Sequence, residues 1–363
     1  MVTSSDLLKF AIERKASDLH ISAGEPPMVR IQGDLVRIDH PALMADETHR
    51  LIFEVMNDGQ RRRFQEHLEV DFAYTLGGER SERGMGGSAR FRVNAFMHER
   101  GEGAVFRQIP EKIPRFDDLG LPPILRTLAQ AEKGLVLVTG PTNSGKSTTL
   151  AAMLDLVNES MAGHILTLED PIEFVHKPKR ALVNQREIGS QSKSFTAALR
   201  SALREDPDVI LVGELRDLET IHLALTAAET GHLVFGTLHT ASAPKTVDRI
   251  IDVFPTEQQA QVRTMLSESL LGVVAQMLVK KKTGGRQAAL EILLGTPAVK
   301  NLIREGKTHQ IPSTMQVAGK LGMQTMEAAL IELVTAGTIT LEEARSRHPG
   351  SEGLAALAAR GLT

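Results

Sequence analysis

The segment GPTNSGKS, residues 140–147, restricts the fold of this chain more than any other feature. It fits the pattern G-x-x-x-x-G-K-[ST], and it lies between a strand-like run, LVLVT, and a helix-like run, STTLAAML. In such an arrangement the glycines let backbone N–H groups surround phosphate groups, and the N-terminus of the following helix adds its positive dipole end. The sequence therefore predicts a strand, a phosphate-binding loop and a helix in succession. The alternative is a glycine-rich turn that binds no ligand.

The same pattern assigns roles to individual residues of the loop. Lys146 is expected to hold the β- and γ-phosphates of a nucleotide, and Ser147 is expected to hold Mg²⁺. ATP and Mg²⁺ are therefore the expected cofactors. The predicted nucleotide-binding residues run from the first glycine into the helix: Gly140, Pro141, Thr142, Asn143, Ser144, Gly145, Lys146, Ser147 and Thr148.

Strand-like and helix-like segments alternate on both sides of this loop. After it, the runs HILTLED, DVILVGE and HLVFGTLH are typical of buried strands, and STTLAAMLDLVNES, FTAALRSALRED and LETIHLALTAAE are typical of helices. Near-continuous apolar strands that alternate with helices predict an α/β domain whose parallel sheet is covered on both faces. From about residue 257 onward the pattern is mostly helical.

The first hundred residues have a different pattern. A helix-like opening, Asp6 to Lys15, is followed by short strand candidates: SDLHIS, MVRIQGDLVRI, VDFAYTL, RFRVNAFM and AVFRQI. This pattern predicts a small α+β domain. The segment GGERSERGMGGS, residues 77–88, is expected to be an exposed, mobile loop between two of the strands.

A proline-rich segment marks the expected domain boundary. IPEKIPRFDDLGLPP, residues 109–123, has four prolines and almost no helical pattern. We therefore expect an N-terminal domain at 1–110, a linker at 111–123 and an ATPase-type domain at 124–363 that ends in helices from about 257. A chain of 363 residues with 42% hydrophobic content has enough apolar material for two cores.

Composition excludes several functional classes. The chain has no cysteine, so disulfides and thiolate zinc sites are excluded. The N-terminus lacks the apolar core of a signal peptide, and no apolar run approaches the ~20 residues that span a bilayer. A net charge of −3, one tyrosine and no tryptophan argue against a nucleic-acid partner.

Acidic residues follow two of the predicted strands. Glu214 emerges at the end of the strand Val209–Val212, where Mg²⁺ and phosphate are expected, whereas Asp208 lies at the start of that strand. An aspartate is usual at this tip, so Glu214 is expected to reach Mg²⁺ through water. TLEDPIEF offers three further acids, one of which could take the proton from an attacking water: Glu169, Asp170 and Glu173. Each of these carboxylates could instead be a solvated loop acid or a helix cap.

Two histidines bracket the strand in ETGHLVFGTLHT, residues 229–240. In an extended strand His232 and His239 lie about 23 Å apart and point to opposite faces, and this geometry argues against a shared metal site. His239 is placed at the phosphate edge as a candidate sensor. For His232, a hydrogen-bonded structural role and a subunit contact remain open.

These motifs together resemble those of a known family. GPTNSGKS, TLEDPIEF, DVILVGE and ETGHLVFGTLHT are similar, in this order, to the Walker A, Asp box, Walker B and His box of secretion ATPases, the hexameric motors of type II secretion and type IV pili. Within that superfamily, the stretch from NQREIGS to FGTLHT resembles the retraction ATPases of the PilT family. The resemblance implies a PAS-like N-terminal domain and a RecA-like P-loop domain.

Carried over by position, the resemblance implies a catalytic set. Glu173 becomes the water-activating base and Glu214 the Mg²⁺-side acid. His232 and His239 become the His-box residues. In the family, two arginines of the N-terminal domain reach the phosphates, and Arg92 and Arg107 match them best. Arg90 could be confused with Arg92 in this match. The alternative for Arg92 is a surface arginine that pairs across strands.

Two features favour retraction among the tasks of the superfamily. Extension and type II secretion ATPases usually carry a further N-terminal domain and a four-cysteine zinc module, and this chain starts at the small domain without cysteine. AVKNLIRE, residues 298–305, is similar to AIRNLIRE of the retraction family. Lys300 and Arg304 are like charges at i,i+4, so we expect a partner or another part of the chain to bind them; the alternative is a solvated basic face.

The resemblance finally implies the partners and the location. It predicts a homohexamer on the cytoplasmic side of the bacterial inner membrane that acts on a pilus platform protein, with no integral membrane segment and no nucleic acid. The alternatives are an accessory retraction ATPase, another type II or type IV secretion assembly ATPase, or a RecA-type nucleic-acid motor. No partner-binding role follows for the loop 77–88 or for the tail RHPGSEGLAALAARGLT.

Overall fold

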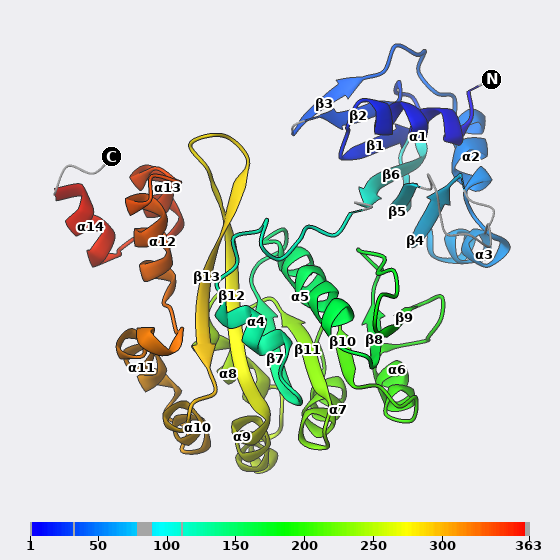
Figure 1. The fold of residues 1–363 in the computed structure, drawn as a ribbon. Helices are drawn as coiled ribbons and strands as arrows, with labels where there is room; N and C mark the ends of the chain where they lie inside the picture. The colour runs from blue at the N-terminus through cyan, green and yellow to red at the C-terminus, as the bar shows by residue number, and fades with distance from the viewer. Residues whose placement is uncertain (1, 32, 78–88, 110–111, 360–363) are drawn as a thin grey trace. The chain divides into compact units, whose positions relative to one another are not determined.

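The computed structural model describes residues 2–31, 33–77, 89–109 and 112–359. The chain divides into two compact units, Met1–Lys112 and Ile113–Thr363 (Figure 1). The loop predicted at 77–88 lies outside the described residues after Gly77, as does residue 111, the first of the expected linker.

The N-terminal unit is built on a six-stranded antiparallel sheet with the order β3-β2-β1-β6-β5-β4. Three helices in the described part of this unit pack against it. The strands are β1 (Asp18–Ser22), β2 (Met28–Ile31), β3 (Asp34–Arg37), β4 (Glu69–Leu76), β5 (Ala89–His98) and β6 (Gly101–Ile109), and the helices are α1 (Ser4–Glu13), α2 (Ala45–Glu54) and α3 (Asp58–His67).

The core of this unit follows from alternation along the strands, because successive side chains point to opposite faces. On β5, Phe91 and Val93 are buried, whereas Arg92 between them is exposed. The buried side chains of β1, β5 and β6 form one cluster with residues of the three helices, including Leu8 and Leu51. The opposite face of the sheet is therefore left for polar side chains.

The strands and the first helix expected in the N-terminal segment are confirmed, but two further helices were missed. MVRIQGDLVRI forms the paired strands β2 and β3. The first helix begins earlier than expected, at Ser4, because the Thr3 side chain and Asp6 form a capping box. Helices α2 and α3 were not predicted.

The C-terminal unit is built on a seven-stranded sheet with the order β13-β12-β7-β11-β10-β8-β9. All neighbouring strands are parallel except β13, which runs antiparallel to β12 at one edge. The strands are β7 (Gly134–Thr139), β8 (His164–Glu169), β9 (Leu182–Glu187), β10 (Val209–Val212), β11 (Leu233–Leu238), β12 (Leu270–Lys280) and β13 (Arg286–Leu294).

Helices cover both faces of this sheet, as the apolar strands predicted (Figure 1). One face packs on α4 and α5, and the other packs on α6 to α10. The helices are α4 (Ile124–Ala129), α5 (Lys146–Ser160), α6 (Phe195–Ala202), α7 (Leu218–Glu229), α8 (Ala243–Asp252), α9 (Thr256–Ser269), α10 (Pro297–Arg304), α11 (Ile311–Val317), α12 (Met326–Thr335), α13 (Leu341–Arg347) and α14 (Glu352–Ala359), with short 3₁₀ turns η1 (Thr308–Gln310) and η2 (Gly319–Leu321).

The expectation of a mostly helical chain from about residue 257 missed the hairpin β12–β13. The run LLGVVAQMLV is apolar almost throughout, and periodicity alone does not separate a buried strand from a buried helix. The hairpin joins the parallel sheet beside β7, and its far part packs on α12, α13 and α14 in a separate core that includes Val279 and Leu330. Strand β9 was also not predicted.

No helix in the described part of the chain is long and apolar enough to cross a membrane.

Candidate functional site

The loops that carry the predicted motifs follow the carboxyl ends of four adjacent strands. Leu238 at the end of β11 lies opposite Thr139 at the end of β7, and Val212 at the end of β10 lies opposite Leu168 of β8. Hydrogen bonds tie these ends together: Gly213 N–H donates to Leu168 O at 2.7 Å, and the Thr237 hydroxyl donates to Gly213 O. The four motifs therefore meet at one edge of the sheet.

The loop between β7 and α5 has the backbone of a phosphate-binding loop. Gly140, Asn143 and Gly145 have φ values of 143°, 64° and 89°, in the region that glycine adopts without strain. No side chain caps the N-terminus of α5, whereas Ser194 and Asp217 cap α6 and α7. The first N–H groups of α5 are thus left for an acceptor from outside the helix.

The Lys146 side chain lies folded into this loop. Its Nζ donates to Gly140 O at 2.8 Å and to Pro141 O at 3.0 Å. Burial lowers the pKa of Lys146, and the negative charges of Glu214 and Glu173 partly oppose that shift. Glu214 at the strand tip and Glu173 of TLEDPIEF therefore both lie within electrostatic reach of Lys146.

Glu214 is half-buried between Arg216 and His239. The Arg216 guanidinium lies 2.7 Å from Glu214 Oε2, and His239 Nε2 lies 3.2 Å from Glu214 Oε1. Partial burial acts to raise the pKa of Glu214, but the hydrogen bonds and charges of Arg216 and His239 outweigh it and hold the pKa below its ordinary value. Glu214 is therefore a carboxylate at neutral pH, with His239 at the same edge.

The three acids of TLEDPIEF have different surroundings. Glu169 Oε1 accepts from the Thr167 hydroxyl at 2.6 Å and from Gln185 Nε2 at 3.1 Å, and burial raises the pKa of Glu169. Asp170 and Glu173 are exposed. The Glu169 side chain is thus fixed by hydrogen bonds within the protein, whereas Glu173 is exposed to solvent near Lys146.

A small cavity of about 40 Å³ lies beside these residues, lined by Ser147, Glu169, His176 and Thr237 among others. His176 is 7% exposed, and burial lowers its pKa to about 4. Its Nδ1 has no hydrogen-bond partner within the described ranges. The imidazole is therefore neutral at physiological pH.

Two residues singled out from the sequence lie at the opposite end of the strands. Asp208 accepts from the His164 N–H at 2.8 Å and thereby links the starts of β8 and β10. His232 Nδ1 pairs with Ala227 O at 3.0 Å, near the C-terminus of α7. The structure therefore gives His232 a local structural contact, remote from the phosphate-binding loop.

The predicted arginines of the N-terminal unit are neighbours on the open face of its sheet. Arg92 on β5 lies directly opposite Arg107 on β6, and Arg107 lies opposite Asp18 on β1. Arg107 Nε donates to Asp18 Oδ1 at 2.8 Å, and Arg92 Nε lies 3.9 Å from Asp71 Oδ1. Arg90 lies two residues before Arg92 and on the same face.

The basic pair of AVKNLIRE contacts another part of the chain. Lys300 Nζ donates to Glu268 O at 3.1 Å, and Arg304 lies 3.4 Å from the Ser267 hydroxyl. Both contacts are at the C-terminus of α9, where cations offset the helix dipole.

One contact to the phosphate-binding loop was missed altogether by sequence reasoning. Gln276 of β12 is buried and hydrogen-bonds Ser144 and Thr149. A single glutamine in an apolar run forms no motif, and its strand was not predicted. Only the recognition of LLGVVAQMLV as a strand next to β7 could have located it.

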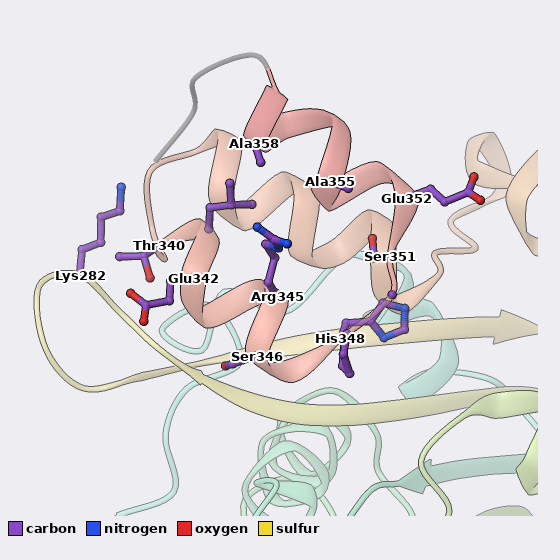
Figure 2. Close-up of a pocket in the computed structure, with 13 residues that line it drawn as sticks. Lys282, Thr340, Glu342, Arg345, Ser346, His348, Ser351, Glu352, Ala355 and Ala358 are labelled. Carbon is purple, nitrogen blue, oxygen red and sulfur yellow. The ribbon is translucent and has the colours of Figure 1, made fainter.

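A cavity away from this edge lies among the C-terminal helices (Figure 2). It has a volume of about 1080 Å³ and is lined by side chains of α13, α14 and the hairpin, including Arg345, His348, Glu342, Ala355 and Lys282. This mixture of acidic, basic and small side chains specifies no single ligand. The candidate functional site is therefore the edge that carries the phosphate-binding loop.

The chain is similar to known proteins over most of its length. Residues 2–346 match the family model described as "Type II/IV secretion system protein". The chain is 57% identical over 343 residues to the type IV pilus retraction ATPase PilT of Pseudomonas aeruginosa, which covers 94% of this chain and 97% of that protein. It is 55% identical over 329 residues to a twitching motility protein of Neisseria gonorrhoeae, with 90% of this chain and 86% of that protein covered.

A solved structure has the same fold. The crystal structure of the pilus retraction motor PilT with bound ADP superimposes with a TM-score of 0.88 and 48% sequence identity. The match covers 97% of this chain and 98% of that chain.

Proposed function

The chain belongs to the type II/IV secretion system protein family, and we propose that it is a homohexameric, Mg²⁺-dependent ATPase that powers type IV pilus retraction. The observation that carries the proposal is the match of nearly the whole chain to a pilus retraction ATPase, in a protein whose phosphate-binding loop opens α5. The N-terminal unit is proposed to be PAS-like and the C-terminal unit RecA-like.

The proposed reaction is hydrolysis of ATP to ADP and phosphate. The N–H groups of the loop and Lys146 bind the phosphates. A water molecule attacks the γ-phosphorus in line, the bond to the β,γ-bridging oxygen breaks, and Glu173 accepts a proton from the water. The exposed position of Glu173 within electrostatic reach of Lys146 supports this assignment.

The residues at this edge fit a magnesium ion. Ser147 and the ionised Glu214 are hard oxygen donors, which Mg²⁺ prefers, and Glu214 is expected to reach it through water. Within the described ranges no cluster of three acidic or histidine side chains could hold a metal alone, which agrees with an ion held mostly by substrate phosphates and water. When bound, Mg²⁺ neutralises phosphate charge.

Arg92 and Arg107 are proposed to complete the site from the N-terminal unit. Both guanidinium groups are exposed on one face of the sheet, each beside a carboxylate of its own unit. Donors that reach the phosphates only when the two units close would couple hydrolysis to a rigid-body motion. We further propose that the hexamer passes this motion to a pilus platform protein at the cytoplasmic face of the inner membrane.

The enzymatic part is tested with purified full-length protein. Wild type is expected to hydrolyse ATP with Mg²⁺ and to sediment as six copies. Lys146→Ala is expected to abolish turnover, because the lysine that binds the phosphates is lost, while Lys133→Ala, an exposed lysine before β7, retains it. Equal hydrolysis by wild type and Lys146→Ala contradicts the site. Strong stimulation by single-stranded DNA would instead favour a nucleic-acid motor.

The cellular role is tested by deletion of the gene, with surface pili counted and twitching motility scored. Retained or increased pili with lost motility are expected for a retraction motor. Absent pili indicate extension, and no change in either indicates an accessory or other secretion role. Complementation with the Lys146→Ala variant is expected to leave motility absent.

A further inference from the structure

Gln276 of β12 forms a buried bridge to the phosphate-binding loop. The residue is 3% exposed, and its amide makes two hydrogen bonds to the same neighbouring segment. Gln276 Nε2 donates to Ser144 O at 2.8 Å, and Gln276 Oε1 accepts from the Thr149 hydroxyl at 2.8 Å. One partner lies in the loop and the other in the first turn of α5, so a single side chain links β12 to both.

The backbone of β12 also lies against the glycines of the loop. A Cβ atom added at Gly140 would lie 2.2 Å from Gln276 O, and one added at Gly145 would lie 2.8 Å from Gln276 Nε2. Real Cβ atoms essentially never approach other atoms this closely. These two glycines therefore permit the contact with β12 as well as the positive φ values of the loop.

The hydrogen bond to Ser144 O fixes the direction of the next peptide N–H. In a trans peptide the C=O and the N–H point in opposite directions. Because Ser144 O points toward β12, the Gly145 N–H points away from β12. Gly145 is the N-cap of α5, so this N–H belongs to the set that faces a bound phosphate.

Loss of the amide would leave buried polar groups without partners. Thr149 is 2% exposed and Ser144 is 3% exposed. A buried carbonyl or hydroxyl without a partner is costly, so the Ser144–Gly145 peptide is expected to reorient when its partner is removed. Reorientation would turn the Gly145 N–H away from the phosphate.

We propose that Gln276 is a positioning residue for nucleotide binding, whose amide holds the Ser144–Gly145 peptide and the first turn of α5 in the phosphate-binding arrangement. The proposal rests on the ATPase function above. It assigns to the β12–β13 hairpin a part in nucleotide affinity, although Gln276 itself does not contact the phosphates.

The test measures the Kd of a fluorescent ADP analogue, N-methylanthraniloyl-ADP, and the KM and kcat for ATP in the full-length protein. Gln276→Met keeps the length of the side chain and removes the amide. It is expected to weaken ADP binding and raise KM by about tenfold, the effect of one buried hydrogen bond, with a smaller change in kcat. Gln276→Glu keeps the acceptor for Thr149 but loses the donor to Ser144, and is expected to be impaired to a similar degree.

Two control variants separate positioning from general stability. Thr149→Val removes only the contact to α5, and it is expected to weaken ADP binding measurably, but less than Gln276→Met does. Gln287→Leu on β13 removes a glutamine whose amide reaches Leu119 O at 3.5 Å, and it is expected to leave ADP affinity unchanged.

Each outcome decides the proposal. A lowered melting temperature of Gln276→Met and Gln276→Glu with wild-type Kd and KM would overturn it, because a merely structural role predicts that result. If Gln276→Met does not fold, the Kd and KM of Gln276→Glu alone test the proposal in the same way. If neither variant folds, the Kd of Thr149→Val tests it, and a wild-type Kd of that variant would overturn the proposal. Failure of the wild-type protein to bind ADP or to hydrolyse ATP would reject the ATPase function itself.

Discussion

The two units place their polar side chains differently with respect to their sheets. In the C-terminal unit the strands are buried on both faces, so the polar side chains gather at the carboxyl edge, where Lys146, Glu214 and His239 meet. In the N-terminal unit helices cover one face of the antiparallel sheet, and Arg92 and Arg107 lie on the other. A parallel sheet thus builds a site at an edge, whereas a half-covered antiparallel sheet offers a face.

The two kinds of placement have different consequences for affinity and rate. At the edge of the C-terminal unit, the phosphate-binding loop and the acidic residues have fixed positions relative to one another, because they follow strands of one hydrogen-bonded sheet. The arginine face carries cations whose present partners are carboxylates of its own unit, Asp18 and Asp71. We therefore expect the edge to determine nucleotide affinity and the arginine face to affect mainly the rate of the chemical step.

The largest effect that separates the two units is expected from the arginines. Arg92→Ala is expected to lower kcat by about 10³-fold or more, the effect of an arginine finger, with the Kd for ADP little changed. Steady-state ATPase assays and ADP titration measure the two quantities. Arg37→Ala, an exposed arginine on β3, is the control with unchanged kcat. If Arg92→Ala has the kcat of the wild type, Arg92 is a surface arginine that pairs across strands and takes no part in the reaction.

A somewhat smaller effect is expected at the edge itself. Glu173→Gln is expected to lower kcat by roughly 10²- to 10⁴-fold, because the amide cannot accept the proton of the attacking water. ADP affinity should be retained. Glu219→Gln, an exposed acid on α7, is the control. If Glu169→Gln lowers kcat and Glu173→Gln does not, the general base is Glu169, and its raised pKa becomes relevant to the rate.

Mild acid should weaken the C-terminal unit through His176. Its folded pKa of about 4 lies below the ordinary value of 6.5, so between these values the unfolded chain binds a proton that the folded chain does not. Stability is therefore highest above pH 6.5 and should fall by about 2 kcal/mol between pH 7 and pH 5. Hydrogen exchange of β8 and β10 amides measures this loss. His176→Leu should reduce it, and His309→Leu, at an exposed site, should not.

The smallest effect is expected in the N-terminal unit. Asp18 is 4% exposed and bonded to Arg107, whereas Asp71 is largely exposed. Asp18→Asn is expected to destabilise this unit by about 1–2 kcal/mol, because a charge-assisted hydrogen bond to a buried acceptor is weakened. Asp71→Asn should cost less than about 0.5 kcal/mol. Hydrogen exchange of β1 and β6 amides compares the variants, and equal losses would contradict the buried pairing.

Much of the C-terminal unit could be predicted because its signals are local. The helix Leu218–Glu229 begins and ends where the pattern LETIHLALTAAE does, and the strand Val209–Val212 is the apolar run before Glu214. Apolar runs between capping residues and glycines define such elements within a few residues of sequence. Helices α2 and α3 were missed because DETHRLIFE and DGQRRRFQE are mostly polar and bury few side chains.

The sequence by itself determined the strand–loop–helix segment at 134–160, the order of the four motifs and the parallel part of the sheet, because each depends on residues close together in the chain. Only the tertiary structure decided that the apolar run after residue 269 forms a hairpin beside β7, that Gln276 bonds the loop, and that Lys300 and Arg304 meet the end of α9. These contacts join residues 32 to 136 positions apart. Such pairings depend on which surfaces pack together in three dimensions, and no local pattern encodes that choice.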